Sequence, residues 1–329
     1  MREEVRRGAM KITQECLHIK QNERVLILTD YDIQTVVSDA LRDAALSLGA
    51  EVSVLAFMPS KGPGKEPSGL AGAAMMQADI IITATSKGIM HSEAITKASN
   101  NGARIFTITE CTEETLATGA IEADFHALQP VFRKLTKVFK TARQVHITSP
   151  GGTDLHFEIT GRNAETCSGI CREPGCKMGF PDAELYIAPI EYLTNGTIVI
   201  DASGTNIGII KEPITITVKN GNAVSIKGGA QASELVHILA STNEESAYIV
   251  SEAAFGLNYK ASVVGKIIED EGVYGTGHFA LGNNIHFGGN NKSSIHIDLV
   301  YWKPTIELDG EIIMENGKLA EPYLIPELK

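Results

Sequence analysis

The first half of the chain alternates strand-length apolar runs with helical patterns, and this alternation constrains its fold most. The apolar runs are RVLILT at 24–29, EVSVLAFM at 51–58, ADIIITAT at 78–85 and ARIFTIT at 103–109. Between the first two, residues 34–48 carry apolar side chains at helical spacing. Strands that alternate with helices predict a parallel sheet with helical crossovers. We therefore expect an α/β, Rossmann-like domain over residues 1–142, closed by a basic amphipathic helix at 127–142.

After residue 143 the pattern changes to a period of two. Apolar and polar residues alternate, and NGN at 220–222 and DGE at 309–311 lie where tight hairpin turns would lie. One helical pattern, at 231–242, interrupts the strands. The fold class we expect is thus an α/β N-terminal domain with a parallel sheet, followed by a β-rich α+β metal-binding catalytic domain over 143–329.

The charge balance and the apolar runs exclude some classes of partner. The net charge is −11, which argues against nonspecific nucleic-acid binding, because that requires a basic face. No apolar run is long enough to span a bilayer, and the charged N-terminus does not resemble a secretion signal. Five cysteines in a long chain indicate a cytoplasmic protein with free thiols. We expect a small peptide or small-molecule substrate, and neither a membrane nor a nucleic acid as partner.

The stretch IHIDLV at 295–300 is the first candidate for a metal site. If it forms a strand, His296 and Asp298 lie on one face while their neighbours pack into the core. An imidazole and a carboxylate two residues apart on a rigid strand can grip one cation. Most such pairs bind no metal, so this motif needs support from elsewhere in the chain.

Three more residues add that support. His278 follows a glycine at the start of an apolar segment, HFALG. Glu184 and Glu252 are set inside apolar stretches, where a carboxylate is costly to bury without a cation or a hydrogen-bond donor. Taken singly, each glutamate could equally be the solvent-facing residue of a half-buried strand.

Four motifs together resemble the aminopeptidase T family of metalloaminopeptidases. They are GFPDAELYIAPIEYLTNGTIVID, SEAAFGLN, HFALG and NKSSIHID, all between residues 179 and 298. In that family two glutamates, two histidines and an aspartate hold two metal ions. The resemblance implies the ligands Glu184, Glu252, His278, His296 and Asp298. It also implies two divalent ions (Zn, Co or Mn), a homodimer, and a hydrolase that removes N-terminal amino acids with a metal-activated water.

One residue departs from this pattern, and a second resemblance follows from it. The aminopeptidases carry a catalytic tyrosine seven residues after the first ligand histidine, where this chain has Ile285; Tyr274 or Tyr301 could replace it only if the fold brings it close. The chain is also shorter than those aminopeptidases, and in length it resembles the 2,5-dihydroxypyridine dioxygenases. Those enzymes use a mononuclear Fe(II) site with two histidines and one carboxylate. In those enzymes a histidine stands at the position of Glu252.

His91 lies in the N-terminal half, directly after a predicted strand, where the dioxygenases carry a catalytic histidine. It is either a proton-handling catalytic residue beside Glu252 or an ordinary residue at a helix start. Because all five ligand residue types are present, the main expectation is the hydrolase. The ring-cleaving dioxygenase is the alternative, and a non-catalytic metal-binding protein comes third.

Three other features have weaker functional interpretations. Cys167, Cys171 and Cys176 have a spacing that fits no common zinc or iron–sulfur pattern, so a loop with free thiols is expected. His286 is expected to be an exposed loop residue. Arg162 is expected to pair with a neighbouring acid rather than with a substrate carboxylate.

Overall fold

The computed structural model describes residues 1–59, 66–90 and 92–328, and the chain divides into two compact units. The first unit comprises Met1–Phe125 and Cys167–Pro181, and the second comprises His126–Thr166 and Asp182–Lys329. The sequence suggests a single boundary at 142 instead. The division differs because 167–181 contributes a strand to the sheet of the first unit, whereas the helix after Phe125 packs within the second.

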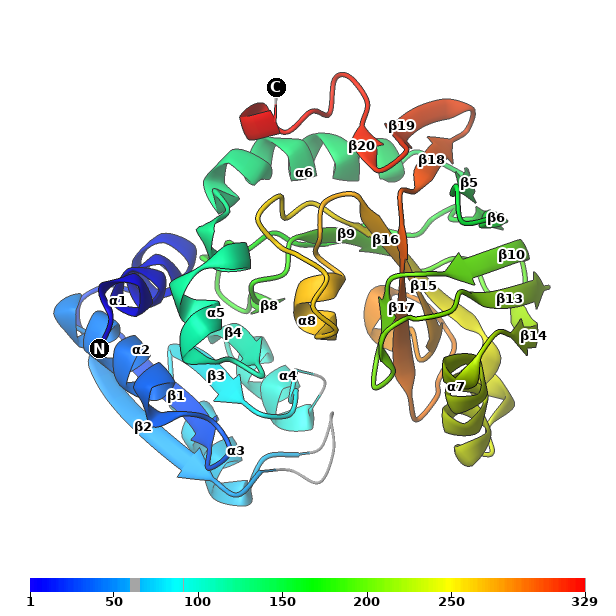
Figure 1. The fold of residues 1–329 in the computed structure, drawn as a ribbon. Coiled ribbons are helices and arrows are strands. Elements are labelled where there is room, and N and C mark those ends of the chain that lie inside the picture. Colours follow the sequence, from blue (N-terminus) through cyan, green and yellow to red (C-terminus); the bar gives the residue numbers. More distant parts are fainter. Residues whose placement is uncertain (60–65, 91, 329) are drawn as a thin grey trace. The chain divides into compact units, whose positions relative to one another are not determined.

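The first unit is built on a parallel sheet, sheet A, with the strand order β2-β1-β3-β4-β8 (Figure 1). Its strands are β1 (Arg24–Asp30), β2 (Glu51–Phe57), β3 (Ile80–Thr85), β4 (Arg104–Thr109) and β8 (Lys177–Gly179). Its helices are α1 (Glu3–Met10), α2 (Thr35–Ser47), α3 (Gly69–Met75), α4 (Glu93–Asn100) and α5 (Glu113–Ala117), with short helical turns η1 (Lys11–Cys16) and η2 (Gly119–Glu122). Each pair of neighbouring strands runs parallel, which confirms the prediction of a parallel sheet with helical crossovers.

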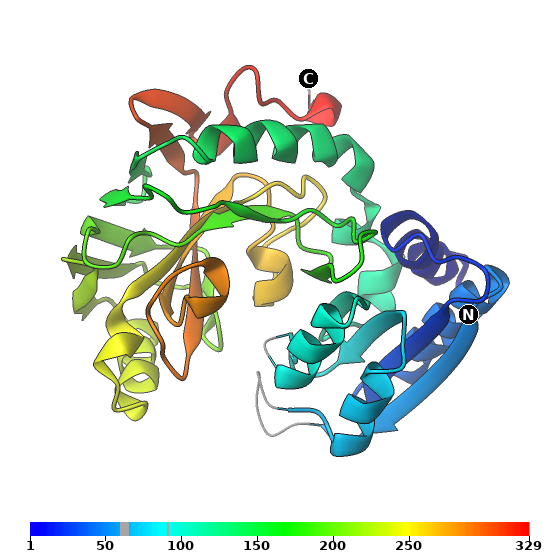
Figure 2. The same cartoon turned by 180° about the vertical axis from the view of Figure 1, so that it is seen from behind.

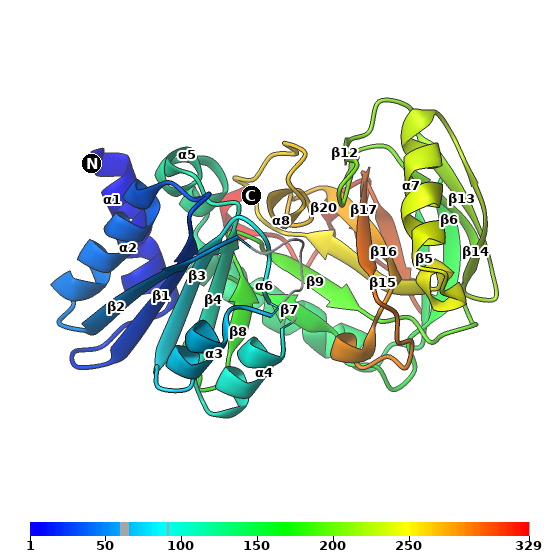
Figure 3. The same ribbon diagram turned by 90° about the horizontal axis from the view of Figure 1, so that it is seen from below.

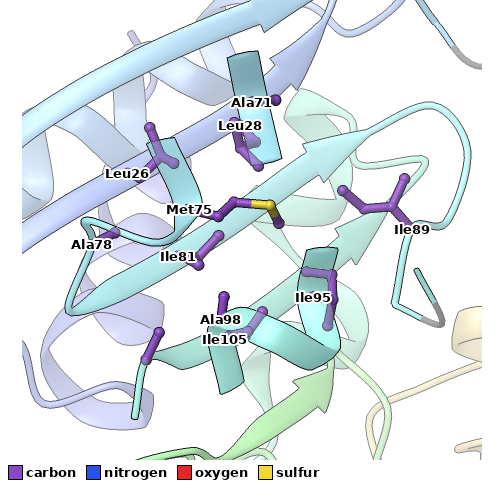
Figure 4. Packing of buried hydrophobic residues seen from close by; sticks show 11 residues of the cluster. Leu26, Leu28, Ala71, Met75, Ala78, Ile81, Ile89, Ile95, Ala98 and Ile105 are labelled. Atoms are coloured by element: carbon purple, nitrogen blue, oxygen red, sulfur yellow. The ribbon is translucent and has the colours of Figure 1, made fainter. Parts of the chain in front are cut away.

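Helices cover both faces of sheet A, with α1, α2 and α5 on one side and α3 and α4 on the other (Figure 3). This is why the central strands β1 and β3 are mostly apolar and buried from Val25 to Asp30 and from Ile80 to Thr85. On the α3–α4 side, alternate strand residues such as Leu28 and Ile81 pack with Met75 and Ile95 of the helices (Figure 4). Both helices begin at a serine whose hydroxyl accepts a backbone N–H, Ser68 for α3 and Ser92 for α4.

The second unit contains two largely antiparallel sheets, sheet B and sheet C. Sheet B has the order β14-β13-β10-β6-β5-β18-β19-β20. Its strands are β5 (Gln144–Thr148), β6 (Asp154–Glu158), β10 (Asn195–Ile200), β13 (Ile214–Lys219), β14 (Asn222–Lys227), β18 (Thr305–Leu308), β19 (Glu311–Glu315) and β20 (Lys318–Leu319). Sheet C has the order β12-β11-β17-β16-β15-β9-β7. Its strands are β7 (Glu165–Cys167), β9 (Glu184–Ile187), β11 (Ser203–Gly204), β12 (Gly208–Ile209), β15 (Val250–Gly256), β16 (Thr276–Gly282) and β17 (His296–Trp302).

The predicted hairpin turns of sheet B occur where the sequence places them. Asn220 and Gly221 join β13 to β14 with φ of 49° and 78°, and Asp309 and Gly310 join β18 to β19 with φ of 47° and 91°. Asparagine, aspartate and glycine tolerate this left-handed region better than other residues, so these dipeptides favour tight reversals.

Three helices accompany these sheets: α6 (Phe125–Phe139), α7 (Ala230–Ser241) and the short α8 (Ile267–Asp270), with one-turn helices η3 (Glu245–Tyr248), η4 (Ile285–Phe287) and η5 (Pro326–Leu328). Phe139 of α6 packs on Phe255 of β15, with ring centroids 6.1 Å apart. The C-terminal stretch lies beside α6 (Figures 1 and 2), where Lys134 donates to the carbonyl of Pro322. The predicted helices at 127–142 and 231–242 are thus present.

Two of the cysteines depart from the prediction of free thiols. Cys171 and Cys176 form a disulfide, because the turn between them brings their Cα atoms to 5.6 Å, within the range that a disulfide spans. Cys16, Cys111 and Cys167 take no part in a disulfide. In the described part of the chain, no helix is both long and apolar enough to cross a membrane.

Candidate metal centre

Strand register brings the five predicted ligands onto one face of sheet C. Ala280 of β16 lies directly opposite Glu252 of β15 on one side and Asp298 of β17 on the other. Residues directly opposite each other share a face, so both carboxylates lie on the face of Ala280. His278 and His296 follow at even spacing along β16 and β17. The methyl group of Ala280 leaves space between the two carboxylates.

Glu184 reaches the same face from the neighbouring strand. It lies opposite Gly256, two residues beyond Ala254, and Ala254 lies opposite His278. All five residues therefore come from four adjacent strands, β9, β15, β16 and β17.

Glu252 is at the centre of this group. Its Oε2 lies 3.0 Å from Nε2 of His296, and its Oε1 lies 3.8 Å from Nε2 of His278. His296 Nε2 is also 3.0 Å from Oδ1 of Asp298, and His278 Nε2 is 3.4 Å from Oε2 of Glu184. The two oxygens of Glu252 thus face different histidines, which is the arrangement of a bridging carboxylate.

Within the second unit, the donor atoms form three overlapping groups, in each of which they lie within 4.8 Å of one another. The groups are Glu184, Glu252 and His278; Glu252, His296 and Asp298; and Glu271, His278 and Asp298. Imidazole nitrogen and carboxylate oxygen suit zinc, manganese and ferrous ions. Each group is therefore chemically able to hold a divalent metal ion.

Contacts outside these groups orient the ligands of the Glu252, His296 and Asp298 group. Nδ1 of His296 lies 2.8 Å from the carbonyl oxygen of Asn283. A carbonyl only accepts, so Nδ1 carries a proton, and Nε2 is the nitrogen that faces the carboxylates and would ligate a metal ion. The hydroxyl of Thr205 donates to Oδ2 of Asp298 and accepts the Asp298 backbone N–H, which directs Oδ1 toward His296.

The side chains of the centre differ in how deeply they are buried. The side chains of Glu184, Glu252 and His278 are 8%, 4% and 1% exposed. Those of His296 and Asp298 are 20% and 14% exposed. The interpretation of Glu184 and Glu252 as solvent-facing residues is therefore wrong, because β9 and β15 lie inside sheet C. The Glu252, His296 and Asp298 group is the side that solvent reaches.

The carboxylates carry more negative charge than the histidines can balance. Burial, and then the charges of Asp182 and Glu271, raise the pKa of Glu184 well above its usual value. Burial and Asp182 have the same effect on the pKa of Glu271. Burial alone would raise the pKa of Glu252 too, but hydrogen bonds from His278 and His296 outweigh it, so that pKa is lowered.

The neighbouring carboxylates also raise the pKa of both histidines. Burial lowers the pKa of His296, but the charge and hydrogen bond of Asp298 outweigh it and raise that pKa well above its usual value.

Two buried atoms, Oε2 of Glu184 and Nδ1 of His278, have no hydrogen-bond partner among the described residues. Buried charges are normally paired or bound to metal, so the excess of carboxylates favours a bound cation.

Neither candidate tyrosine replaces the one missing at Ile285. Ile285 is exposed. Tyr301 lies on the opposite face of β17 from His296 and Asp298, where it is fully buried and stacks on Phe279. The hydroxyl of Tyr274 accepts the backbone N–H of Leu319 in sheet B.

Two expectations about loop residues are confirmed. His286 is exposed in η4. Arg162 pairs with Glu191, whose other oxygen accepts from Asn284 and from the backbone of Asn290. Through Glu191, the loop between β16 and β17 is therefore joined to Arg162. His91 lies outside the described residues, so its catalytic role stays a prediction.

Sequence reasoning missed several residues of this site. Phe287 lies beside His296 with ring centroids 5.0 Å apart, and Tyr186 meets Phe287 edge-on at 5.5 Å. Tyr186 is two residues from Glu184 on the same strand face, a signal the sequence does contain. Glu271 and Thr205 come from loops, where no periodicity marks them.

The fold and site define a protein with a parallel α/β unit and a β-rich unit that carries a histidine–carboxylate centre. Residues 9–321 match the sequence model of the NicX family, 2,5-dihydroxypyridine 5,6-dioxygenase. This match covers nearly the whole chain, and the chain belongs to that family.

Individual relatives agree with this assignment. The 2,5-dihydroxypyridine 5,6-dioxygenase of Pseudomonas putida is 27% identical over 197 residues, which are 56% of this chain and 56% of that relative. The match thus spans about half the length of the curated relative. The solved structure of 2,5-dihydroxypyridine dioxygenase from Pseudomonas putida KT2440 has a TM-score of 0.84 at 22% identity and covers 97% of both chains.

A further structure, wild-type AmpT from Thermus thermophilus, has a TM-score of 0.72 at 15% identity and covers 96% of this chain and 99% of that chain. At these identities both structures show the fold alone. They confirm the mixed α/β fold.

The prediction of an aminopeptidase-type hydrolase is wrong. The family match and the curated relative both belong to the dioxygenases, whereas the likeness to AmpT is one of fold at low identity. The expected removal of N-terminal amino acids by a metalloprotease is therefore wrong as well. The ligand residue types favoured the aminopeptidases, whereas the chain length and Ile285 in place of the tyrosine favoured the dioxygenases. The homodimer and the cytoplasmic location stay predictions.

Proposed function

We propose that this chain is an Fe(II)-dependent dioxygenase that opens the ring of a dihydroxypyridine-like aromatic diol with O₂. The observation that carries the proposal is the family match over residues 9–321. Glu252, His296 and Asp298 hold the iron, because this group is oriented by its neighbours and is the more exposed side of the centre. Substrate and O₂ both need such an open side.

The donor set fits a ferrous ion, with one difference from the set expected for the dioxygenases. One imidazole and two carboxylates replace two imidazoles and one carboxylate, since Glu252 stands where a histidine was expected. Both sets offer hard or borderline donors on one side of the metal. The additional negative charge of Glu252 attracts a divalent cation more strongly than a neutral imidazole would.

The buried residues Glu184, Glu252 and His278 would hold a second divalent ion, and Glu252 would be a ligand in both groups. The buried Oε2 of Glu184, which has no hydrogen-bond partner among the described residues, and the excess of carboxylates support this. These side chains are 8%, 4% and 1% exposed, so an ion bound there would exchange with solvent more slowly than one at the exposed group.

When bound, Fe(II) would supply the activation of O₂ for its reaction with an aromatic diol. The chain's own residues orient the metal ligands and shape the substrate's surroundings. Asn283 and Thr205 hold His296 and Asp298 in place. Phe287 and Tyr186 offer aromatic surface beside His296, against which a flat ring packs favourably.

Oxygen uptake tests this function directly. The protein is purified anaerobically, loaded with Fe(II), and mixed with 2,5-dihydroxypyridine in an oxygen-electrode cell. Both oxygen atoms enter the product and one ring bond breaks, so O₂ and substrate should be consumed in equal amounts without an added reductant. Loss of the ring's ultraviolet absorbance reports cleavage independently.

Variants identify the site. Asp298→Ala should abolish oxygen uptake and lower the iron content, while Asp43→Ala, at an exposed aspartate of α2, should change neither. No oxygen uptake by iron-loaded protein with any dihydroxypyridine would overturn the proposal. Full activity in Asp298→Ala would overturn the assignment of the iron site.

A further inference from the structure

A second group of metal-ligating side chains lies on sheet B, outside the centre on sheet C. His146 of β5 lies directly opposite His156 of β6, and Asp154 lies two residues before His156 on the same strand face. The intervening residues point the other way and are buried; they are Val145, Ile147, Leu155 and Phe157. The strong alternation of this hairpin therefore places both imidazoles and the carboxylate together on the open face.

The three side chains converge on one point. Nε2 of His146 lies 2.8 Å and Nε2 of His156 lies 3.7 Å from the same oxygen, Oδ1 of Asp154. The two rings stack with centroids 3.8 Å apart and an interplanar angle of 8°. All three donor atoms lie within 4.8 Å of one another.

This spacing is close to what one metal ion needs. Zinc binds imidazole nitrogen and carboxylate oxygen at about 2.0–2.2 Å, so two donors of a tetrahedral ion are about 3.4 Å apart. The side chains of His156 and Asp154 are 65% and 68% exposed, so they can close the remaining gap by small rotations. Water can complete the shell from the open side.

The backbone that carries these ligands is held in place before any ion binds. Thr153, in the turn between β5 and β6, is buried, and its hydroxyl exchanges hydrogen bonds with the backbone N–H and carbonyl of Val199. Cross-strand pairing fixes the two histidines at a separation suited to chelation. Little ordering is therefore needed on binding.

The local charge also favours a cation. A depression of about 320 Å³ beside the two histidines is lined by three acidic residues, Glu158, Glu307 and Asp309. Glu307 lies directly across from His146 on β18. Among the described residues that line this depression there is no lysine or arginine.

We propose that His146, Asp154 and His156 form a surface site for one divalent transition-metal ion of the zinc class. The donors are two imidazoles and one carboxylate with no thiolate, which suits Zn²⁺, Ni²⁺, Co²⁺ or Cu²⁺ and not Ca²⁺ or Mg²⁺. The site does not depend on the proposed dioxygenase function, because its ligands lie on another sheet from Glu252 and its partners.

Equilibrium dialysis against Zn²⁺ tests this site in the full-length protein. The number of bound zinc ions per chain is compared for the wild type, His156→Asn and His237→Asn. His237 is an exposed histidine of α7 that belongs to no group of three metal-ligating side chains among the described residues, so it is the matched control. We expect one ion fewer in His156→Asn and no change in His237→Asn.

A second variant and a second metal make the outcome unambiguous. Asp154→Asn should lose the same ion, and Mg²⁺ at equal concentration should not compete for it. Circular dichroism checks that each variant is folded. Equal zinc content in the wild type, His156→Asn and Asp154→Asn would overturn the proposal, as would an equal loss in His237→Asn, which would mean nonspecific binding to surface histidines.

Discussion

Glu252→Gln is the substitution that tests the metal centre most sharply. Glu252 lies between both histidines, with one oxygen facing each, and its side chain is only 4% exposed. The amide keeps the shape and removes the negative charge. Because Glu252 belongs to both the exposed and the buried group, this change should lower the affinity for a metal ion at both groups. Glu184→Gln should lower the affinity only at the buried group.

The size of the effect follows from binding linkage. A metal at a free concentration of about 100 times its Kd stabilises the folded state by about 2.7 kcal/mol. For a unit of about 150–250 residues this raises Tm by roughly 5–10 °C. Glu252→Gln should lose nearly all of this metal-dependent rise, and Glu184→Gln should retain the part that the Glu252, His296 and Asp298 group provides.

The assay is thermal unfolding of chelator-treated protein with and without added metal. Mn²⁺ serves as a redox-stable substitute for Fe(II), and metal content is measured in parallel. Glu245→Gln, at an exposed glutamate of η3, is the matched control and should behave as the wild type. If Glu252→Gln shows the full metal-dependent rise in Tm, the bridging role of Glu252 is refuted.

Three further substitutions probe single contacts. Thr205→Val removes the hydroxyl that orients Asp298 and should weaken metal affinity about 10-fold or more, measured by competition with a chelating dye. Phe287→Ala removes the ring beside His296 and should raise KM for 2,5-dihydroxypyridine by about 2–10-fold with metal content unchanged; an unchanged KM would contradict a substrate contact. Tyr301→Phe removes a buried hydroxyl that has no hydrogen-bond partner among the described residues, so urea unfolding should show equal or higher stability, by up to about 1–2 kcal/mol; a loss of more than about 1 kcal/mol would reveal a partner.

The ligand residues of this centre do not by themselves distinguish a dioxygenase from a hydrolase. The ligand residue types are those expected of an aminopeptidase, yet the family assignment is to dioxygenases. Ile285 is the visible difference, because it is exposed and offers no proton donor. Residue types at metal ligands therefore identify a metal centre more reliably than they identify its reaction.

Local periodicity in the sequence was enough to predict the elements. The alternation of apolar runs and helical patterns predicted sheet A, and the asparagine–glycine and aspartate–glycine dipeptides predicted the hairpins at 220 and 309. These are short-range properties, since side-chain direction and turn conformation depend on residues near in sequence. The shared face of His296 and Asp298 was predicted for the same reason.

Only the tertiary structure decided which residues meet. The pairing of β9, β15, β16 and β17 buries Glu184 and Glu252 beside His278, and it brings Glu271 and Thr205 from loops that carry no pattern. The hairpin register likewise sets His146 against His156. These contacts join residues distant along the chain, and the register of strand pairing that creates them is a property of the whole sheet rather than of any one segment.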